Sequence, residues 1–268
     1  MYFTLIGRSR KWIPSKASIL ISIISIVSFS TFGNAQNILD SYSRLSFSAG
    51  FEKVYGFEID QLPFGLHYEH IEQSVPSIGI HYDIYRWENS LLRTGLRLTR
   101  IIEKEFVLLP DNYTGAPAGS FIVYIDTSTG FDDLRYELSL GYNYFIINKR
   151  TFAFYLGAEG IFGLGQNTYP SVLEIGFGPN ETQLTAAHQS PSSVYGKLGV
   201  ETGIKFATPH FLARINFFYH YRLQNMLEGH LVINNSNNEL IEREYQLKGD
   251  SYGVSLMIYP KKRKKKVQ

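Results

Sequence analysis

The sequence predicts an all-β protein: an eight-stranded antiparallel up-and-down transmembrane β-barrel. Three observations lead to this prediction. Aromatic residues make up 15% of the chain and occur with 23 glycines, a composition that suits pleated sheets. Eight segments alternate apolar and polar residues with period two, which indicates strands, because the same charges on a helix would point in all directions. Short connections between these segments also alternate with long ones.

Each predicted strand carries apolar residues on one face and polar, charged or glycine residues on the other. In Phe131–Phe145, for example, Tyr136 and Leu138 alternate with Arg135 and Glu137. The predicted strands are Ser43–Glu52, Ser77–Arg86, Leu91–Ile102, Phe131–Phe145, Thr151–Leu164, Ser193–Phe206, Phe211–Leu223 and Ser251–Tyr259. Most of these segments reach the 9–11 residues or so that a tilted strand needs to cross a bilayer.

The connections distinguish the two ends of this barrel. Three are tight turns and four are long, in strict alternation, as in bacterial outer-membrane barrels with short periplasmic turns and long extracellular loops. The short connections are 87–90, 146–150 and 207–210, and the long ones are 53–76, 103–130, 165–192 and 224–250. Whether 53–76 or 103–130 contain further strands stays open at this stage.

The polar faces of the predicted strands carry many ionisable side chains, which we expect to point into a narrow lumen. Glycines on the same faces would make room for them, since the interior of an eight-stranded barrel is just wide enough for side chains. We predict that the charges pair with one another, because an unpaired buried charge is costly. The predicted network is Arg93, Arg97, Arg135, Glu137, Glu159, Lys197, Glu201 and Arg214. The alternative is a soluble sandwich or lipocalin-like barrel, in which these charges would face water.

Aromatic residues near the strand ends are expected to form an interfacial girdle facing lipid. The predicted girdle residues are Tyr142, Tyr144, Phe145, Tyr219, Tyr221 and Tyr259, whereas Tyr85 is predicted on the polar, lumen-facing side of its strand.

The N-terminus predicts export. Arg8, Arg10 and Lys11 precede an apolar run that ends in the small-residue sequence 33–35, the pattern of a cleaved secretory signal peptide. We therefore predict a signal peptide at 1–35, a barrel at 36–260 and a basic periplasmic tail at 261–268. An uncleaved membrane anchor is the alternative for the first segment.

Charge and cysteine content exclude several functions. The net charge of +2 arises from the basic run at 261–266, so the chain as a whole gives no sign of nucleic-acid binding. Cysteine is absent, which removes disulfides, thiolate zinc sites and cysteine nucleophiles. The basic tail could hold the barrel to anionic headgroups or another acidic envelope component, or it could be a solvated end.

The last predicted strand contains a further motif. Ser251, Gly253, Leu256 and Ile258 match the order polar, glycine, hydrophobic, hydrophobic that outer-membrane barrels present as an assembly signal. With this motif and its strand–turn–loop pattern, the chain resembles small bacterial outer-membrane β-barrels of the OmpA-type or porin family. The resemblance implies an outer-membrane location, with membrane lipid and the barrel-assembly machinery as partners. The chain departs from the family pattern after Tyr259, where a lysine tail follows.

The predicted function is a structural or binding role through the long extracellular loops, toward a ligand or partner that the sequence does not identify. A narrow porin for small solutes is the alternative, and an outer-membrane lipid-modifying hydrolase is a third. The hydrolase reading would rest on His188 and Ser190, which fall in a predicted loop. A cluster at 67–72, with His67, Glu69, His70 and Glu72, could ligate a metal, but we interpret it as part of a solvated loop. We therefore predict no catalytic, cofactor or metal site.

Overall fold

The computed structural model describes residue 39 and residues 41–262, with gaps at 63–65, 71–73, 103–104, 111–120, 127–131, 150, 166–170, 178–181, 190 and 235–239. The predicted signal peptide and most of the basic tail lie outside these residues. Within them, no helix is both long and apolar enough to cross a membrane.

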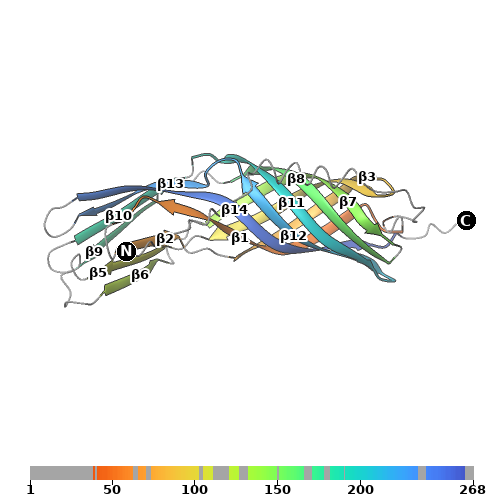
Figure 1. Cartoon of the computed structure of the whole chain (residues 1–268), viewed down its shortest axis with the longest axis horizontal. Helices are drawn as coiled ribbons and strands as arrows, with labels where there is room; N and C mark the ends of the chain where they lie inside the picture. The colour runs from red at the N-terminus through yellow and green to blue at the C-terminus, as the bar shows by residue number, and fades with distance from the viewer. Residues whose placement is uncertain are drawn as a thin grey trace, which may run out of the picture. The chain divides into compact units, whose positions relative to one another are not determined.

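Eight antiparallel strands of the described chain close into a barrel, in which each strand pairs with the next and β14 returns to β1 (Figure 1). The barrel strands are β1 (Leu45–Ile59), β3 (Ser74–Arg86), β4 (Ser90–Ile102), β7 (Asp132–Asn148), β8 (Phe152–Leu164), β11 (Val194–Ala207), β12 (Phe211–Arg222) and β14 (Leu240–Pro260). Each predicted strand overlaps one of these, so the predicted barrel is confirmed. Closure removes the free edges that an open sheet would expose.

The short connections all lie at one end of the barrel, here called the turn end. Each is closed by a backbone hydrogen bond across it: the Trp87 N–H donates to Ser90 O at 2.9 Å, and the Thr208 N–H donates to Phe211 O at 2.9 Å. These bonds satisfy backbone groups where the strands reverse direction.

At the opposite end, β1 and β14 continue past the barrel into a second structure, here called the extension. Residues 251–260 of β14 pair with β12, whereas residues 240–247 pair with β13 (Leu227–Asn234). The sheet then continues through β10 (Thr182–Gln189) to β9 (Ser171–Phe177). One strand therefore belongs to both the barrel wall and the extension sheet.

A second sheet of the extension consists of β2 (His67–His70), β5 (Glu105–Pro110) and β6 (Phe121–Asp126). A buried apolar cluster includes Tyr68 and Val107 from this sheet and Leu184, Leu231 and Tyr245 from the other. The extension is thus a two-layer β structure with its own core, as in a small sandwich.

The long connections are therefore not the plain loops that the sequence predicted. Connections 53–76 and 103–130 contain β2, β5 and β6, which answers the question left open for them. Connections 165–192 and 224–250 contain β9, β10, β13 and the start of β14. These strands were missed because they are short, and because a segment such as Thr182–Gln189 has few large apolar residues to show an alternation.

The barrel exposes apolar side chains on its outer face and buries charged side chains inside. Leu96 and Phe51 on the outer face are 65% and 61% exposed, while Arg214 and Lys205 inside are fully buried. The large exposed hydrophobic residues of the barrel strands form an apolar outer surface, which only a lipid environment would cover favourably.

Two bulges lie near the turn end, and the first of them alters the predicted facing of an aromatic residue. The register shifts between Asp83 and Tyr85 and again between Phe145 and Ile147. Tyr85, predicted to face the lumen, lies beyond the first shift and is exposed. A bulge adds one residue to a strand, which reverses the facing of the residues beyond it. Phe145, predicted in the girdle, lies before the second shift and is buried on the same face as Arg135 and Glu137, in step with the alternation of β7. Tyr259 is also buried, on the lumen side of β14, so neither residue belongs to the girdle.

Candidate functional site

The eight side chains of the predicted lumen network all lie inside the barrel. Arg97 is the most exposed of them, with 12% of its side chain accessible. They come from β4, β7, β8, β11 and β12, so their contacts cross the lumen as well as following the wall.

Glu201 on β11 is the centre of one part of this network. Its carboxylate lies 2.8 Å from Arg93 Nη2 and 2.9 Å from Arg214 Nη2. Asn143 contacts both sides of this arrangement: its Nδ2 donates to Glu201, and its Oδ1 accepts from Arg214 Nη1 at 2.8 Å. One carboxylate thus joins two guanidinium groups from different strands, with an amide holding both.

Glu137 on β7 is the centre of a second part. It accepts hydrogen bonds from Arg97 Nε at 2.6 Å and from the Tyr195 hydroxyl at 2.9 Å, and Lys197 Nζ lies 2.9 Å away. Glu52 on β1 lies 3.0 Å from Lys197 Nζ and 3.4 Å from Arg97 Nη2. Sequence reasoning did not name Glu52, although it falls on the same face as the inward serines of its strand.

The remaining predicted members are attached to these two centres. Glu159 lies 3.5 Å from Arg93 Nη2 and 2.9 Å from His220 Nε2. The Arg135 guanidinium lies over the Tyr195 ring at 5.4 Å from its centroid, a cation–π arrangement. The network therefore includes a histidine and a tyrosine that fall on the polar faces of their predicted strands but were not predicted as members.

Glycines on the lumen face leave space that large side chains fill. A Cβ at Gly163 would overlap the Tyr195 ring, and a Cβ at Gly95 would overlap the His81 ring. A void of about 30 Å³ lies between the two parts of the network, bordered by His81, Arg93 and Glu201. Such a volume holds about one water molecule, so the lumen at this level is filled by side chains.

The turn end of the lumen is covered by the segment that precedes β1. Arg86 donates hydrogen bonds to the carbonyl oxygens of Leu39, Tyr42 and Ser43, at 3.0 Å for Tyr42. Leu39 is fully buried there. A single guanidinium, itself paired with Asp83 at 2.8 Å, thereby fixes the chain across this opening.

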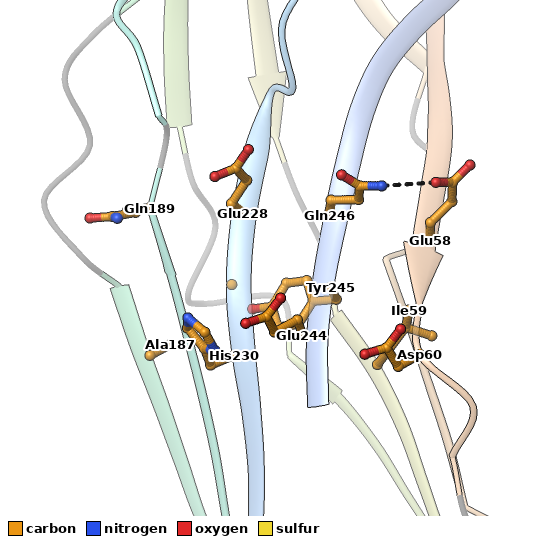
Figure 2. A pocket seen from close by; sticks show the side chains of 11 residues that line it. Glu58, Ile59, Asp60, Ala187, Gln189, Glu228, His230, Glu244, Tyr245 and Gln246 are labelled. Carbon is orange, nitrogen blue, oxygen red and sulfur yellow. Dashed lines mark hydrogen bonds between the residues drawn. The ribbon is translucent and has the colours of Figure 1, made fainter. Parts of the chain in front are cut away.

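The extension carries a groove of about 740 Å³ on the outer face of its larger sheet (Figure 2). Two cross-strand rows of residues line it. In one row, Glu228 on β13 faces Gln246 on β14, which faces Glu58 on β1. In the other, His230 faces Glu244, whose carbonyl oxygen accepts the Asp60 N–H at 3.3 Å. Figure 2 shows these polar side chains on adjacent strands, with Gln246 donating to Glu58 at 2.9 Å.

The other sequence candidates are not brought together into a site among the described residues. His188 lies in β10, with Gly229 and Ser171 as its backbone neighbours, while Ser190 is outside the described residues. His67 begins β2, but the side chains of Glu69 and His70, and all of Glu72, fall outside what the structure describes. Over the residues that it does describe, no group of three or more potential ligands could hold a metal ion.

The residues of the predicted assembly signal all lie in the last strand, β14. Leu256 and Ile258 are on the outer face, at 44% and 39% exposure, while Ser251 is buried. Gly253 lies on the lumen side, where its added Cβ would meet the Phe218 ring.

A closed barrel with an apolar outer surface and a charged, filled lumen defines the chain as a transmembrane β-barrel of the outer-membrane type. No family model and no curated protein matches the sequence.

Several solved structures are similar at low identity. The outer membrane protein OprG from Pseudomonas aeruginosa is 10% identical, with a TM-score of 0.40 and coverage of 82% of this chain and 98% of OprG. Neisserial surface protein A is 14% identical, with a TM-score of 0.36, covering 82% and 99% of the two chains. Ail, the attachment invasion locus protein of Yersinia pestis, is 9% identical, with a TM-score of 0.31, covering 81% and 99%. These similarities are distant, and the class rests on the barrel of this chain itself.

Proposed function

We propose that this protein is a bacterial outer-membrane barrel with a closed lumen, whose role is to hold the extension at the cell surface as a binding structure. The observation that carries the proposal is the lumen. Ion pairs from six strands fill its middle, and the void left between them is only about 30 Å³. A narrow porin would need a continuous aqueous path, and a hydrolase would need a substrate cavity beside a nucleophile.

The connection between barrel and extension supports the binding role. β1 and β14 pair with each other without interruption by another strand, from Phe47↔Ile258 in the barrel to Ile59↔Tyr245 in the extension. A surface carried on such strands is held more rigidly than one on a loop.

Export and assembly complete the proposal. The segment 1–35 directs secretion, the barrel-assembly machinery recognises the end of β14 that contains Ser251–Ile258, and the outer face of the barrel contacts membrane lipid. The protein is not an enzyme and uses no cofactor.

Planar-bilayer recording of the purified, refolded protein tests the closed lumen. The expected result is the absence of steady single-channel current. A large and steady current would instead support the porin alternative and would overturn the proposal.

Cysteine labelling in intact cells tests the surface display, and the native chain offers no competing thiol. Val172 on β9 is 51% exposed, and Glu88 lies in a turn at the other end of the barrel. We expect a membrane-impermeant maleimide to label Val172→Cys in intact cells and Glu88→Cys only after permeabilisation. The reverse pattern would contradict the proposed orientation.

A further inference from the structure

The outer face of the extension sheet differs from the rest of the extension because it has a groove with one sign of charge. Four carboxylates line this groove, from Glu58, Asp60, Glu228 and Glu244. The lining contains no lysine or arginine among the described residues. The opposite side of the same strands packs into the apolar core, so the groove is the side of this sheet that is open to a partner.

Most of this charge is not neutralised within the protein. In the described part of the chain, no ion pair joins Asp60, Glu228 or Glu244 to a basic side chain. Glu228 does accept a hydrogen bond from the neutral amide of Asn225 at 2.8 Å. Carboxylates on strands about 4.8 Å apart repel one another. A cationic partner in the groove would remove this repulsion.

The fourth carboxylate shows which chemistry the groove accepts. Glu58 binds the ammonium of Lys248 and receives a second hydrogen bond from Gln246 at 2.9 Å. The hydrogen bond from Lys248 lowers the pKa of Glu58, and the same bond raises the pKa of Lys248. A primary ammonium is therefore already bound at one end of the row that contains Glu228, Gln246 and Glu58.

The size of the groove and the spread of its carboxylates distinguish between cations. A volume of about 740 Å³ exceeds what a single ion needs. The carboxylates lie on three strands, and the described residues contain no convergent group of three metal-ligating side chains. An extended chain presents alternate side chains about 7 Å apart, a spacing that lets successive basic residues reach carboxylates on neighbouring strands.

We propose that this groove binds an extended polypeptide segment that carries lysine or arginine at alternate positions. The inference rests on the proposed binding role of the extension and gives it a partner of defined chemistry. Recognition would come from charge complementarity along the two rows of the lining.

The test uses the full-length protein in detergent micelles and a fluorescein-labelled octapeptide of alternating lysine and threonine. Fluorescence anisotropy at low salt should show saturable binding that weakens as salt is added, because the contacts are exposed charge pairs. The same peptide with glutamate in place of lysine should not bind. The groove variant Asp60→Asn/Glu228→Gln/Glu244→Gln should lose at least tenfold in affinity.

A matched control removes the same number of charges at positions that do not line the groove. Glu88→Gln/Glu174→Gln/Glu242→Gln changes three exposed glutamates outside the groove lining and should keep its affinity within about twofold. The charge reversal Glu244→Lys is a second groove variant, and it should weaken binding even if the triple variant folds poorly. Heat-modifiable gel mobility reports whether each variant is folded.

Three outcomes would overturn the inference: an equal loss in the control variant, no binding of the basic peptide, or displacement of the peptide by calcium at micromolar concentration. The last result would assign the groove to a divalent cation. A failure of this kind would leave the absence of current and the surface labelling of Val172→Cys unaffected. Failure of the proposed function would appear in those two measurements instead.

Discussion

The barrel and the extension of this protein share two strands but bury opposite kinds of side chain. In the barrel, the buried side of the sheet is charged and the exposed side is apolar, with Arg214 fully buried and Leu96 65% exposed. In the extension the order is the usual one, since Leu231 and Ile233 are buried and Glu244 is exposed. β1 and β14 pass from one environment to the other, so each must exchange its apolar face on the way.

The two strands make this exchange differently. In β14 the more buried positions are odd-numbered in both regions, but the apolar residues change from Tyr245 and Leu247 to Tyr252 and Val254. In β1 the aromatic residues stay odd-numbered, from Phe51 to Phe57, while their facing changes from the outer surface of the barrel to the core of the extension. The register of the pair shifts between Tyr55 and Phe57.

Two glycines lie where the exchange occurs. Gly56 on β1 has φ = 102° and Gly249 on β14 has φ = 79°, a region that other residues adopt only with strain. Changing the sequence pattern and turning the backbone are thus two routes to the same result. The position of either change marks the boundary between the barrel wall and the extension.

The largest expected loss of stability comes from removing one of the buried charges of the barrel lumen. Replacing Glu201 with glutamine leaves Arg93 and Arg214 without their shared carboxylate in a closed lumen. Removing one member of a buried ion pair costs about 3–5 kcal/mol. The midpoint of urea unfolding, followed by gel mobility in lipid vesicles, should fall accordingly.

The matched substitution in the extension is Glu242→Gln, which also removes one glutamate charge but from an exposed position. Its effect should stay within about 0.5 kcal/mol, as for most surface changes. Equal midpoints for the two variants would show that the lumen charges are solvated rather than paired.

A smaller and more local effect is expected at the junction. An alanine at Gly249 would be strained at φ = 79°, and its Cβ would lie 2.7 Å from the Met226 Cβ. We expect a loss of about 1–3 kcal/mol that is confined to the extension. Hydrogen exchange should therefore quicken in β13 and stay unchanged in β8.

Gly160→Ala is the control for this variant, because no atom lies within 4 Å of the added Cβ and its φ is not positive. This substitution should leave exchange unchanged in both strands. If Gly249→Ala also left β13 unchanged, the junction would tolerate strain and the role given to this glycine would be wrong.

The sequence predicted the barrel well because period two is read from each strand independently of its neighbours. Facing alone assigned Arg93, Glu137 and Glu201 to one side of the wall. Their partners depend on register and on side-chain length across the lumen, and neither is visible in a single strand. For this reason Glu52 and His220 were not recognised as members of the network.

The extension was missed for a related reason. Its strands are short, and their alternation of apolar and polar residues has the opposite facing. The apolar residues of Leu227–Asn234 face a core, while those of the barrel face lipid. The alternation of Leu227, Leu231 and Ile233, followed by the asparagine-rich sequence 235–238, was the available signal. The bulge that turns Tyr85 outward could not be predicted in this way, because one extra residue in a strand leaves its composition unchanged.

The smallest expected effect concerns the exposed pair of Glu58 and Lys248. The hydrogen bond from Lys248 holds the pKa of Glu58 below its usual value of 4.5, so the stabilisation that this pair contributes is present above that value and is lost as pH falls through the lowered pKa. Because both side chains are exposed, the unfolding midpoint should barely move, and the sensitive measurement is an NMR titration of the Glu58 carboxyl carbon.

In Lys248→Met the carboxyl should titrate closer to 4.5, whereas Lys261→Met at the opposite end of the barrel should leave it unchanged. Added salt should raise the midpoint of the Glu58 titration in the wild type, as Lys248→Met does, because salt screens an exposed pair. Identical titrations in the wild type and Lys248→Met would show that the groove does not bind its own ammonium, which would remove one support for a basic partner.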